Sequence, residues 1–144
     1  MIRYGVLLDA KSAKYKETLI DLANNTNVQI FAANRIFINT NVSVLPIKEL
    51  HGFNKPVFTL TAEAADILLH IPTNSTKILF IQDIDWNLRA VPYEMLQYVY
   101  QHDKLKLVCS KQEIADAVSE CWKKPEAIIE RLTKENINGF LQIK

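Results

Sequence analysis

Two carboxylates and an indole directly follow an apolar run near the middle of the chain. The run Ile78-Leu-Phe-Ile81 ends in Gln82-Asp83-Ile84-Asp85-Trp86. A short apolar segment bounded by polar residues is typical of a buried strand in a parallel sheet. Residues just past the carboxyl end of such a strand face the crevice where α/β proteins bind ligands. The sequence therefore predicts a site at residues 82–86.

The spacing of Asp83 and Asp85 could hold a divalent cation. Two carboxylates two residues apart can bind Mg²⁺ or Mn²⁺ against the diphosphate of a nucleotide sugar. The alternative is a pair of solvated side chains at a strand end, and no phosphate-binding segment accompanies the pair. We therefore expect no metal, with Asp83 and Asp85 as the candidate ligands if one binds.

Three residues on neighbouring loops are expected at the same edge of the sheet. Asp9 follows the first predicted strand, Lys11 lies on its loop, and Thr61 follows a later strand. A receiver domain also gathers carboxylates at strand ends, but it would need a second acid beside Asp9 and a lysine after the last strand. Trp86 could stack on a sugar or a base.

Other chemistries lack the residues that they require. A dinucleotide fingerprint or a P-loop needs glycine in a strand-to-helix turn, and none of the three glycines lies in one: Gly5, Gly52 and Gly139. No nucleophile elbow surrounds Ser110, which starts a capping-box pattern instead. The histidines are scattered at His51, His70 and His102. We expect no cofactor, and the catalytic residues are unknown.

Composition restricts the partners and the compartment. The 144 residues carry a formal charge of +1 without a basic run, which argues against nucleic acid. No apolar segment is long enough to cross a bilayer, and the first residues do not resemble a signal peptide. We therefore expect a cytoplasmic protein without membrane contact, in which Cys109 and Cys121 are small buried hydrophobic residues.

Strand and helix patterns alternate along the chain. Strands are expected at residues 3–8, 28–32, 42–46, 56–60, 78–81 and 105–109, and helices at 12–25, 61–69, 92–102 and 110–122. Residues 35–38 fit a short strand or a helical turn, and Pro125 is expected to start a short helix. Gly139 should break the chain before a short tail. The alternation predicts one Rossmann-like domain over residues 1–144, a three-layer α/β sandwich with a mainly parallel sheet.

Three segments together resemble the N-terminal domain of GT-B glycosyltransferases. They are Thr59-Leu-Thr-Ala-Glu-Ala-Ala65, Lys77-Ile-Leu-Phe-Ile-Gln-Asp-Ile-Asp-Trp86 and Leu107-Val-Cys-Ser-Lys-Gln-Glu-Ile-Ala115. The similarity covers about residues 56–122. Family members have a second Rossmann-like domain that binds the nucleotide sugar, and this chain stops where that domain would begin. It also lacks the glycine-rich loop that often follows the first strand.

The resemblance implies an acceptor-side half without its donor site. We expect a non-catalytic binding or accessory protein that takes a carbohydrate or glycosylated acceptor, alone or with a second chain or as a homodimer. Its rim would comprise Asp9, Lys11, Thr61, Gln82, Asp83, Asp85 and Trp86. The alternatives are a small metal-dependent glycosyltransferase using Asp83 and Asp85, and a structural or assembly protein. Residues 133–144 could fold back across the sheet, as C-terminal helices do in the family.

Overall fold

The computed structural model describes residues 1–33, 43–84 and 92–142, whose strands form one parallel sheet. The described strands follow the order β3-β2-β1-β4-β5-β6-β7, and every neighbouring pair is parallel. Their bounds are β1 Tyr4–Leu8, β2 Val28–Ala32, β3 Val44–Pro46, β4 Val57–Thr59, β5 Lys77–Ile81, β6 Leu105–Cys109 and β7 Ala127–Ile128. The element expected at residues 35–38 lies outside the described residues.

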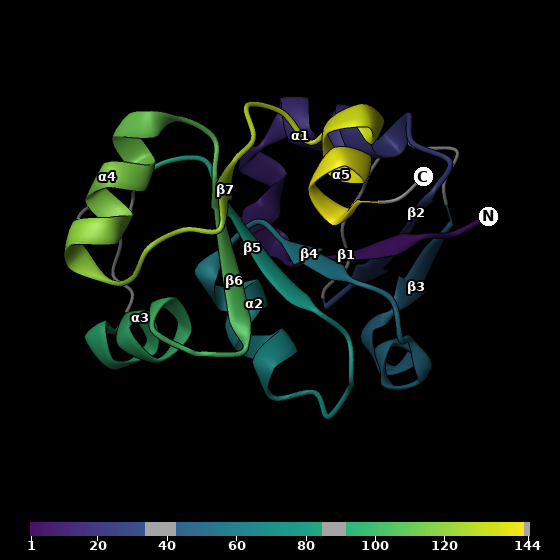
Figure 1. Cartoon of the computed structure of the whole chain (residues 1–144). Coiled ribbons are helices and arrows are strands. Elements are labelled where there is room, and N and C mark those ends of the chain that lie inside the picture. Colours follow the sequence, from purple (N-terminus) through teal and green to yellow (C-terminus); the bar gives the residue numbers. More distant parts are fainter. Residues whose placement is uncertain (34–42, 85–91, 143–144) are drawn as a thin grey trace.

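Helices cover both faces of the sheet, which confirms the predicted three-layer architecture (Figure 1). The described residues include five α-helices: α1 Lys16–Ala23, α2 Ala62–Leu69, α3 Tyr93–Tyr100, α4 Gln112–Cys121 and α5 Lys134–Leu141. The same parts of the chain also hold two 3₁₀ helices, η1 Ala10–Lys14 and η2 Ile47–Gly52. Within the described ranges, no helix has the length and apolar character needed to span a bilayer.

Alternating side chains along the strands form the two core layers. In β1, Tyr4 and Val6 belong to the cluster beneath α1 and α5, whereas Leu7 belongs to the cluster beneath η2 and α2. All five β1 residues are buried because helices cover both faces of the strand. This explains why β1, and β5 after Lys77, have continuous apolar sequences instead of an apolar–polar alternation.

The strand order places a topological switch point between β1 and β4. From β1 the chain proceeds outward through β2 and β3, then returns to β4 and proceeds outward on the other side. This is the doubly wound order with one additional edge strand, and ligands of such sheets bind beyond the carboxyl ends of the strands at the switch point. Asp9 follows β1 and Thr61 lies two residues after β4.

Two predictions near the C-terminus are wrong. The segment expected to start a helix at Pro125 forms β7 instead, because its backbone completes the hydrogen bonding of β6: Glu126 N donates to Leu107 O (2.7 Å) and Ile129 N donates to Cys109 O (2.8 Å). Gly139 does not break the chain, since it lies inside α5. The Thr133 hydroxyl caps this helix by accepting from Asn136 N at 3.3 Å.

Helix starts follow the sequence signals only in part. Thr61 caps α2 as expected, but Ser12 is not the N-cap of the first helix. Asp9 holds that position, and the helix divides into η1 and α1 at Tyr15. The predicted cap at Ser110 is also wrong, because α4 has Lys111 at its N-cap without a side-chain hydrogen bond.

The two cysteines have different environments. Cys109 is buried at the end of β6, as predicted, but Cys121 is exposed, contrary to the prediction. Helix α4 ends at Cys121, and the partly buried Trp122 takes the inward position, where it stacks on Tyr100 with ring centroids 5.4 Å apart.

Only Cys121 should react rapidly with a thiol reagent in the native protein. Burial raises the pKa of the Cys109 thiol to about 11, so at pH 8 only about one molecule in a thousand would carry the reactive thiolate. Titration with a chromogenic disulfide should release one fast equivalent from native protein and two after unfolding. Cys121→Ser should abolish the fast phase, and two fast equivalents from the native protein would contradict the prediction.

Candidate functional site

A buried carboxylate joins the two strand ends at the switch point. Asp9 is 6% exposed, and its Oδ1 accepts from Ser12 N at 3.1 Å, Ser12 Oγ at 2.8 Å and Thr61 Oγ1 at 3.0 Å. The Ser12 hydroxyl also accepts from Asp9 N at 3.2 Å, which completes a reciprocal cap of η1. Asp9 therefore links the end of β1 to the loop after β4.

The Thr61 hydroxyl is fully used in the same network. It donates to Asp9 and accepts from Ala64 N at 3.1 Å, so it caps α2. In the first turn of α2, Glu63 contacts Lys11 of η1, with 3.5 Å between Oε1 and Nζ. Lys11 is about half exposed, so this contact lies at the outer edge of the network.

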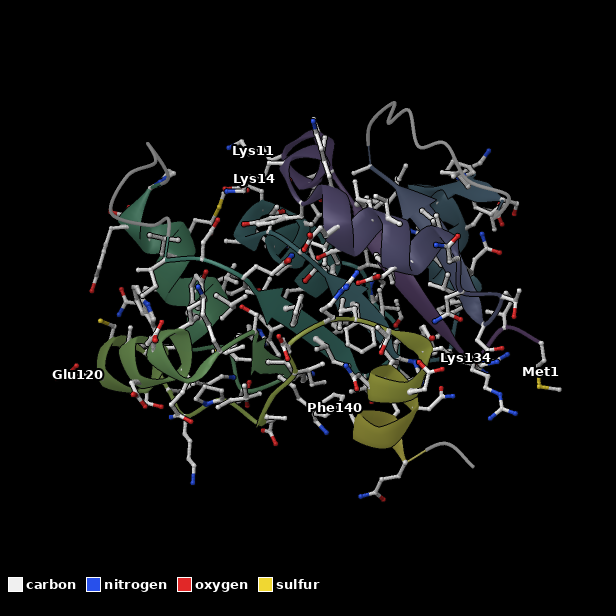
Figure 2. The ribbon with its side chains drawn as sticks, turned by 90° about the horizontal axis from the view of Figure 1, so that it is seen from above. Met1, Lys11, Lys14, Glu120, Lys134 and Phe140 are labelled. Carbon is white, nitrogen blue, oxygen red and sulfur yellow. The ribbon has the colours of Figure 1, made fainter. Side chains whose placement is uncertain are left out.

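Residues of η1 and α1 cover the end of β5. Thr18 Oγ1 donates to Gln82 Oε1 at 2.6 Å, and Tyr15 Oη donates to Asp83 Oδ1 at 3.1 Å. Lys14 Nζ lies 3.7 Å from the other oxygen of Asp83. Lys11 and Lys14 extend from the same side of the molecule (Figure 2). Both carboxylate oxygens of Asp83 therefore already have protein partners.

Very little open space is left inside this network. The cavity between Tyr15, Thr61, Gln82 and Asp83 has a volume of about 10 Å³, enough for about one water molecule. Gln82 Nε2 is buried without a hydrogen-bond partner among the described residues, and a single water in this cavity would satisfy it. A small molecule could not enter without displacing the η1–α1 side chains.

The structure brings most of the predicted rim together. Asp9 and Thr61 bond directly, Gln82 and Asp83 lie under α1, and Lys11 stands at the outer edge. Asp85 and Trp86 lie outside the described residues. No group of three or more histidine, cysteine, aspartate or glutamate side chains suited to a metal occurs in the described part of the chain.

Sequence reasoning missed the residues that close the site, which are Ser12, Tyr15 and Thr18. Ser12 follows Asp9 by three positions, the spacing of a capping box, so that contact could have been inferred. Tyr15 and Thr18 are also three residues apart, and this spacing places them on one side of a helix. Their partners Gln82 and Asp83 are more than sixty residues away in the chain. No local sequence pattern predicts hydrogen bonds between residues so far apart.

The groups at this edge that could contact a ligand are the outer, partly exposed ones. Asp9, Thr61 and the Gln82 carbonyl are committed to internal hydrogen bonds. Asp83 and Lys11 combine internal contacts with roughly half-exposed side chains, at 48% and 53%. A carboxylate and an ammonium can exchange hydrogen bonds with ligand hydroxyls at the surface.

Comparison with known proteins identified no relative. No family model matches the chain, and neither the curated proteins nor the solved structures gave a significant match. The fold assignment therefore rests on the strand order and the layers described above.

Proposed function

We propose that this chain is a glycosyltransferase-like single domain that binds a carbohydrate or glycosylated acceptor and does not catalyse glycosyl transfer by itself. The observation that supports this proposal best is the nearly filled cavity of about 10 Å³ at the switch point. A catalytic site must hold its substrate against reactive groups and exclude water. A filled crevice with polar groups along its outer edge instead favours shallow contact with a larger ligand.

An acceptor would lie along the outer edge, across Lys11, Lys14 and Asp83. The contacts of Asp83 with Tyr15 and Lys14 hold its carboxylate in place, and nearly half of the side chain stays exposed to a ligand. A preorganised but shallow rim loses little entropy on binding, yet it buries little ligand surface. We therefore expect weak binding, with a dissociation constant of about 1 mM.

The proposal can be tested by titrating oligosaccharides of different composition into isotopically labelled protein and following the amide signals. Saturable shifts should gather at residues 9–15, 61–63 and 82–84, and Asp83→Ala should weaken them several-fold. The matched control is Asp103→Ala, a carboxylate that is 93% exposed and lies beyond α3, near the amino ends of the strands. Equal weakening by both variants, or turnover of a nucleotide sugar that is lost in Asp83→Ala, would overturn the proposal.

Two measurements distinguish the competing functions. A metal-dependent transferase using Asp83 and Asp85 requires Mn²⁺-dependent heat when nucleotide sugars are titrated into the protein by calorimetry. A structural or assembly protein requires a dimer whose sedimentation does not change with ligand. The proposed accessory function predicts no metal-dependent binding of nucleotide sugars. It also predicts more than a dimer that does not respond to ligand, since the protein should bind an oligosaccharide.

A further inference from the structure

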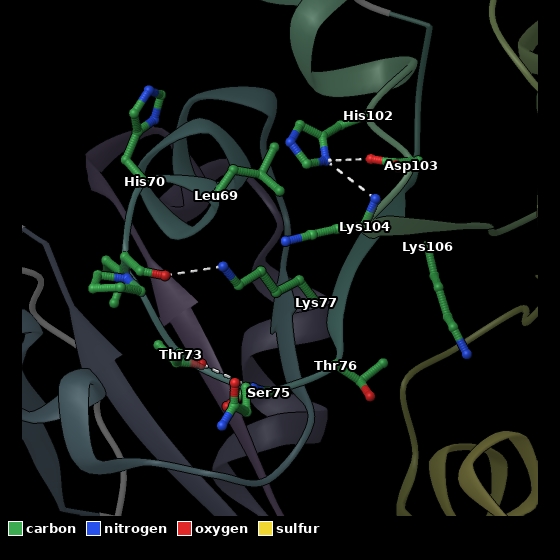
Figure 3. A pocket seen from close by; sticks show the side chains of 13 residues that line it. Leu69, His70, Thr73, Ser75, Thr76, Lys77, His102, Asp103, Lys104 and Lys106 are labelled. Atoms are coloured by element: carbon green, nitrogen blue, oxygen red, sulfur yellow. Dashed lines mark hydrogen bonds and ion pairs between the residues drawn. The ribbon is translucent and has the colours of Figure 1, made fainter.

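A second cavity lies at the opposite edge of the sheet, at the amino ends of β5 and β6. It has a volume of about 760 Å³ and is bordered by the last residues of α2, the loop over residues 72–76, and the turn between α3 and β6 (Figure 3). Three lysines line it, Lys77, Lys104 and Lys106, against one aspartate, Asp103. This cavity differs from the filled switch point in both size and charge.

One lysine of the cavity, Lys77, and one outside it, Lys123, bind backbone carbonyls that follow helices. Lys77 is only 7% exposed, and its Nζ donates to Ile71 O at 3.0 Å, beyond the last turn of α2. On the far side, Lys123 Nζ donates to the carbonyls of His102 and Leu105, which follow α3. The ammonium groups of Lys77 and Lys123 are therefore already bound to backbone carbonyls.

Lys104 has no such role. Its side chain extends toward Lys77 (Figure 3), and no carboxylate of the described residues forms an ion pair with it. Its backbone N–H donates to His102 Nδ1 at 3.1 Å, so this ring nitrogen is the acceptor in that contact. Asp103 lies 3.6 Å from the same nitrogen, and its side chain is almost fully exposed.

Two ammonium groups thus share one cavity without a counter-charge between them. Burial lowers the pKa of the Lys77 ammonium, and the charge of Lys104 lowers that pKa further. Lys77 has two N–H donors left after its bond to Ile71. The Thr73 hydroxyl accepts from Ser75 N at 2.9 Å, so its own proton is available to an acceptor in the cavity.

We propose that this cavity binds a phosphate group, held between Lys77 and Lys104 with the Thr73 hydroxyl as a third donor. A compact dianion with several acceptor oxygens matches two ammonium groups and a hydroxyl. It would also neutralise the repulsion between the lysines. The site is independent of the acceptor rim, because it lies at the other end of the strands.

Lys106 provides a matched control at the same cavity. It lies two residues after Lys104, and its side chain extends away from Lys77 (Figure 3). Replacing either lysine with glutamine changes the net charge equally, but only Lys104→Gln removes a proposed ligand. Neither ammonium has a hydrogen bond in the described part of the structure, so both variants should fold normally.

The test is a titration of inorganic pyrophosphate into isotopically labelled protein at low ionic strength. Amide signals of residues 73–77 and 102–105 should shift saturably with a dissociation constant of about 1 mM or below. Lys104→Gln should weaken binding at least tenfold, and Lys106→Gln no more than about twofold. Shifts spread over all surface lysines, or equal weakening by the two variants, would overturn the proposal.

A parallel titration with ADP identifies the source of the phosphate. If the site takes a phosphate carried by a larger molecule, ADP shifts the same amides and depends equally on Lys104. If it takes the free anion, pyrophosphate alone shifts them. Both results support the site, and the absence of any shift with either ligand overturns it.

Discussion

Replacing Asp9 with alanine is expected to lower the free energy of unfolding by about 3 kcal/mol, because three buried donors would lose their shared acceptor. These donors are the amide and hydroxyl of Ser12 and the hydroxyl of Thr61. The loss affects both the cap of η1 and the connection to α2. Chemical denaturation followed by circular dichroism measures the difference.

Asp9→Asn tests whether the acceptor or its charge is responsible. The amide oxygen retains an acceptor at the same position, so this variant should lose clearly less stability than alanine. Asp103→Ala is the control at an exposed position, and it should leave the unfolding midpoint unchanged. If Asp9→Ala lowered the free energy of unfolding no more than Asp103→Ala does, the Asp9 hydrogen bonds would not stabilise the switch point.

Truncating Ile137 to alanine is expected to cost about 2–4 kcal/mol. Ile137 is the fully buried residue of α5, and it packs into the cluster formed by β1, α1 and the central strands. Alanine would leave a cavity beneath the helix, since the sheet below cannot collapse into it. Thermal and denaturant unfolding both report the loss.

Ile20→Ala serves as the matched control for this change. It removes the same atoms from a helix on the same face of the sheet, but Ile20 is 58% exposed and the cost should be within about 0.5 kcal/mol. Equal effects would mean that α5 contributes no more than a surface helix. The larger loss at Ile137 would identify the C-terminal helix as part of the core.

The sheet could be predicted because its signals are local. The strands at Tyr4–Leu8, Val28–Ala32 and Leu105–Cys109 combine apolar runs with polar flanks, and each run is long enough to identify alone. β7 could not be predicted because two residues are too few to show a hydrophobic periodicity. Their extended conformation results from hydrogen bonding to β6. Similarly, Gly139 lowers helix propensity, but packing of the surrounding apolar residues of α5 overrides that cost.

The position of the candidate site could be predicted from the sequence, but whether the site is open or filled could not. Parallel strands place Asp9, Thr61 and Asp83 at one edge, and strand ends alone suffice to infer this. Whether that edge is open depends on Tyr15 and Thr18, whose contacts with Asp83 and Gln82 span more than sixty residues. The proposed phosphate cavity had no sequence signal, because Lys77 and Lys104 come to line one cavity only through the pairing of β5 with β6.

The three residues of β4 have a further consequence for the cooperativity of the domain. They form the only strand pairing in the described sheet that joins β1–β3 to β5–β7. The Thr59 hydroxyl strengthens this seam by donating to Ile78 O at 2.9 Å, and Asp9 with Thr61 closes it just beyond the strand end. As long as β4 stays paired with β1 and β5, we expect the two halves of the sheet to unfold together in one cooperative transition. The switch point, where the candidate ligand site lies, is thus also the place where the two halves of the sheet are joined.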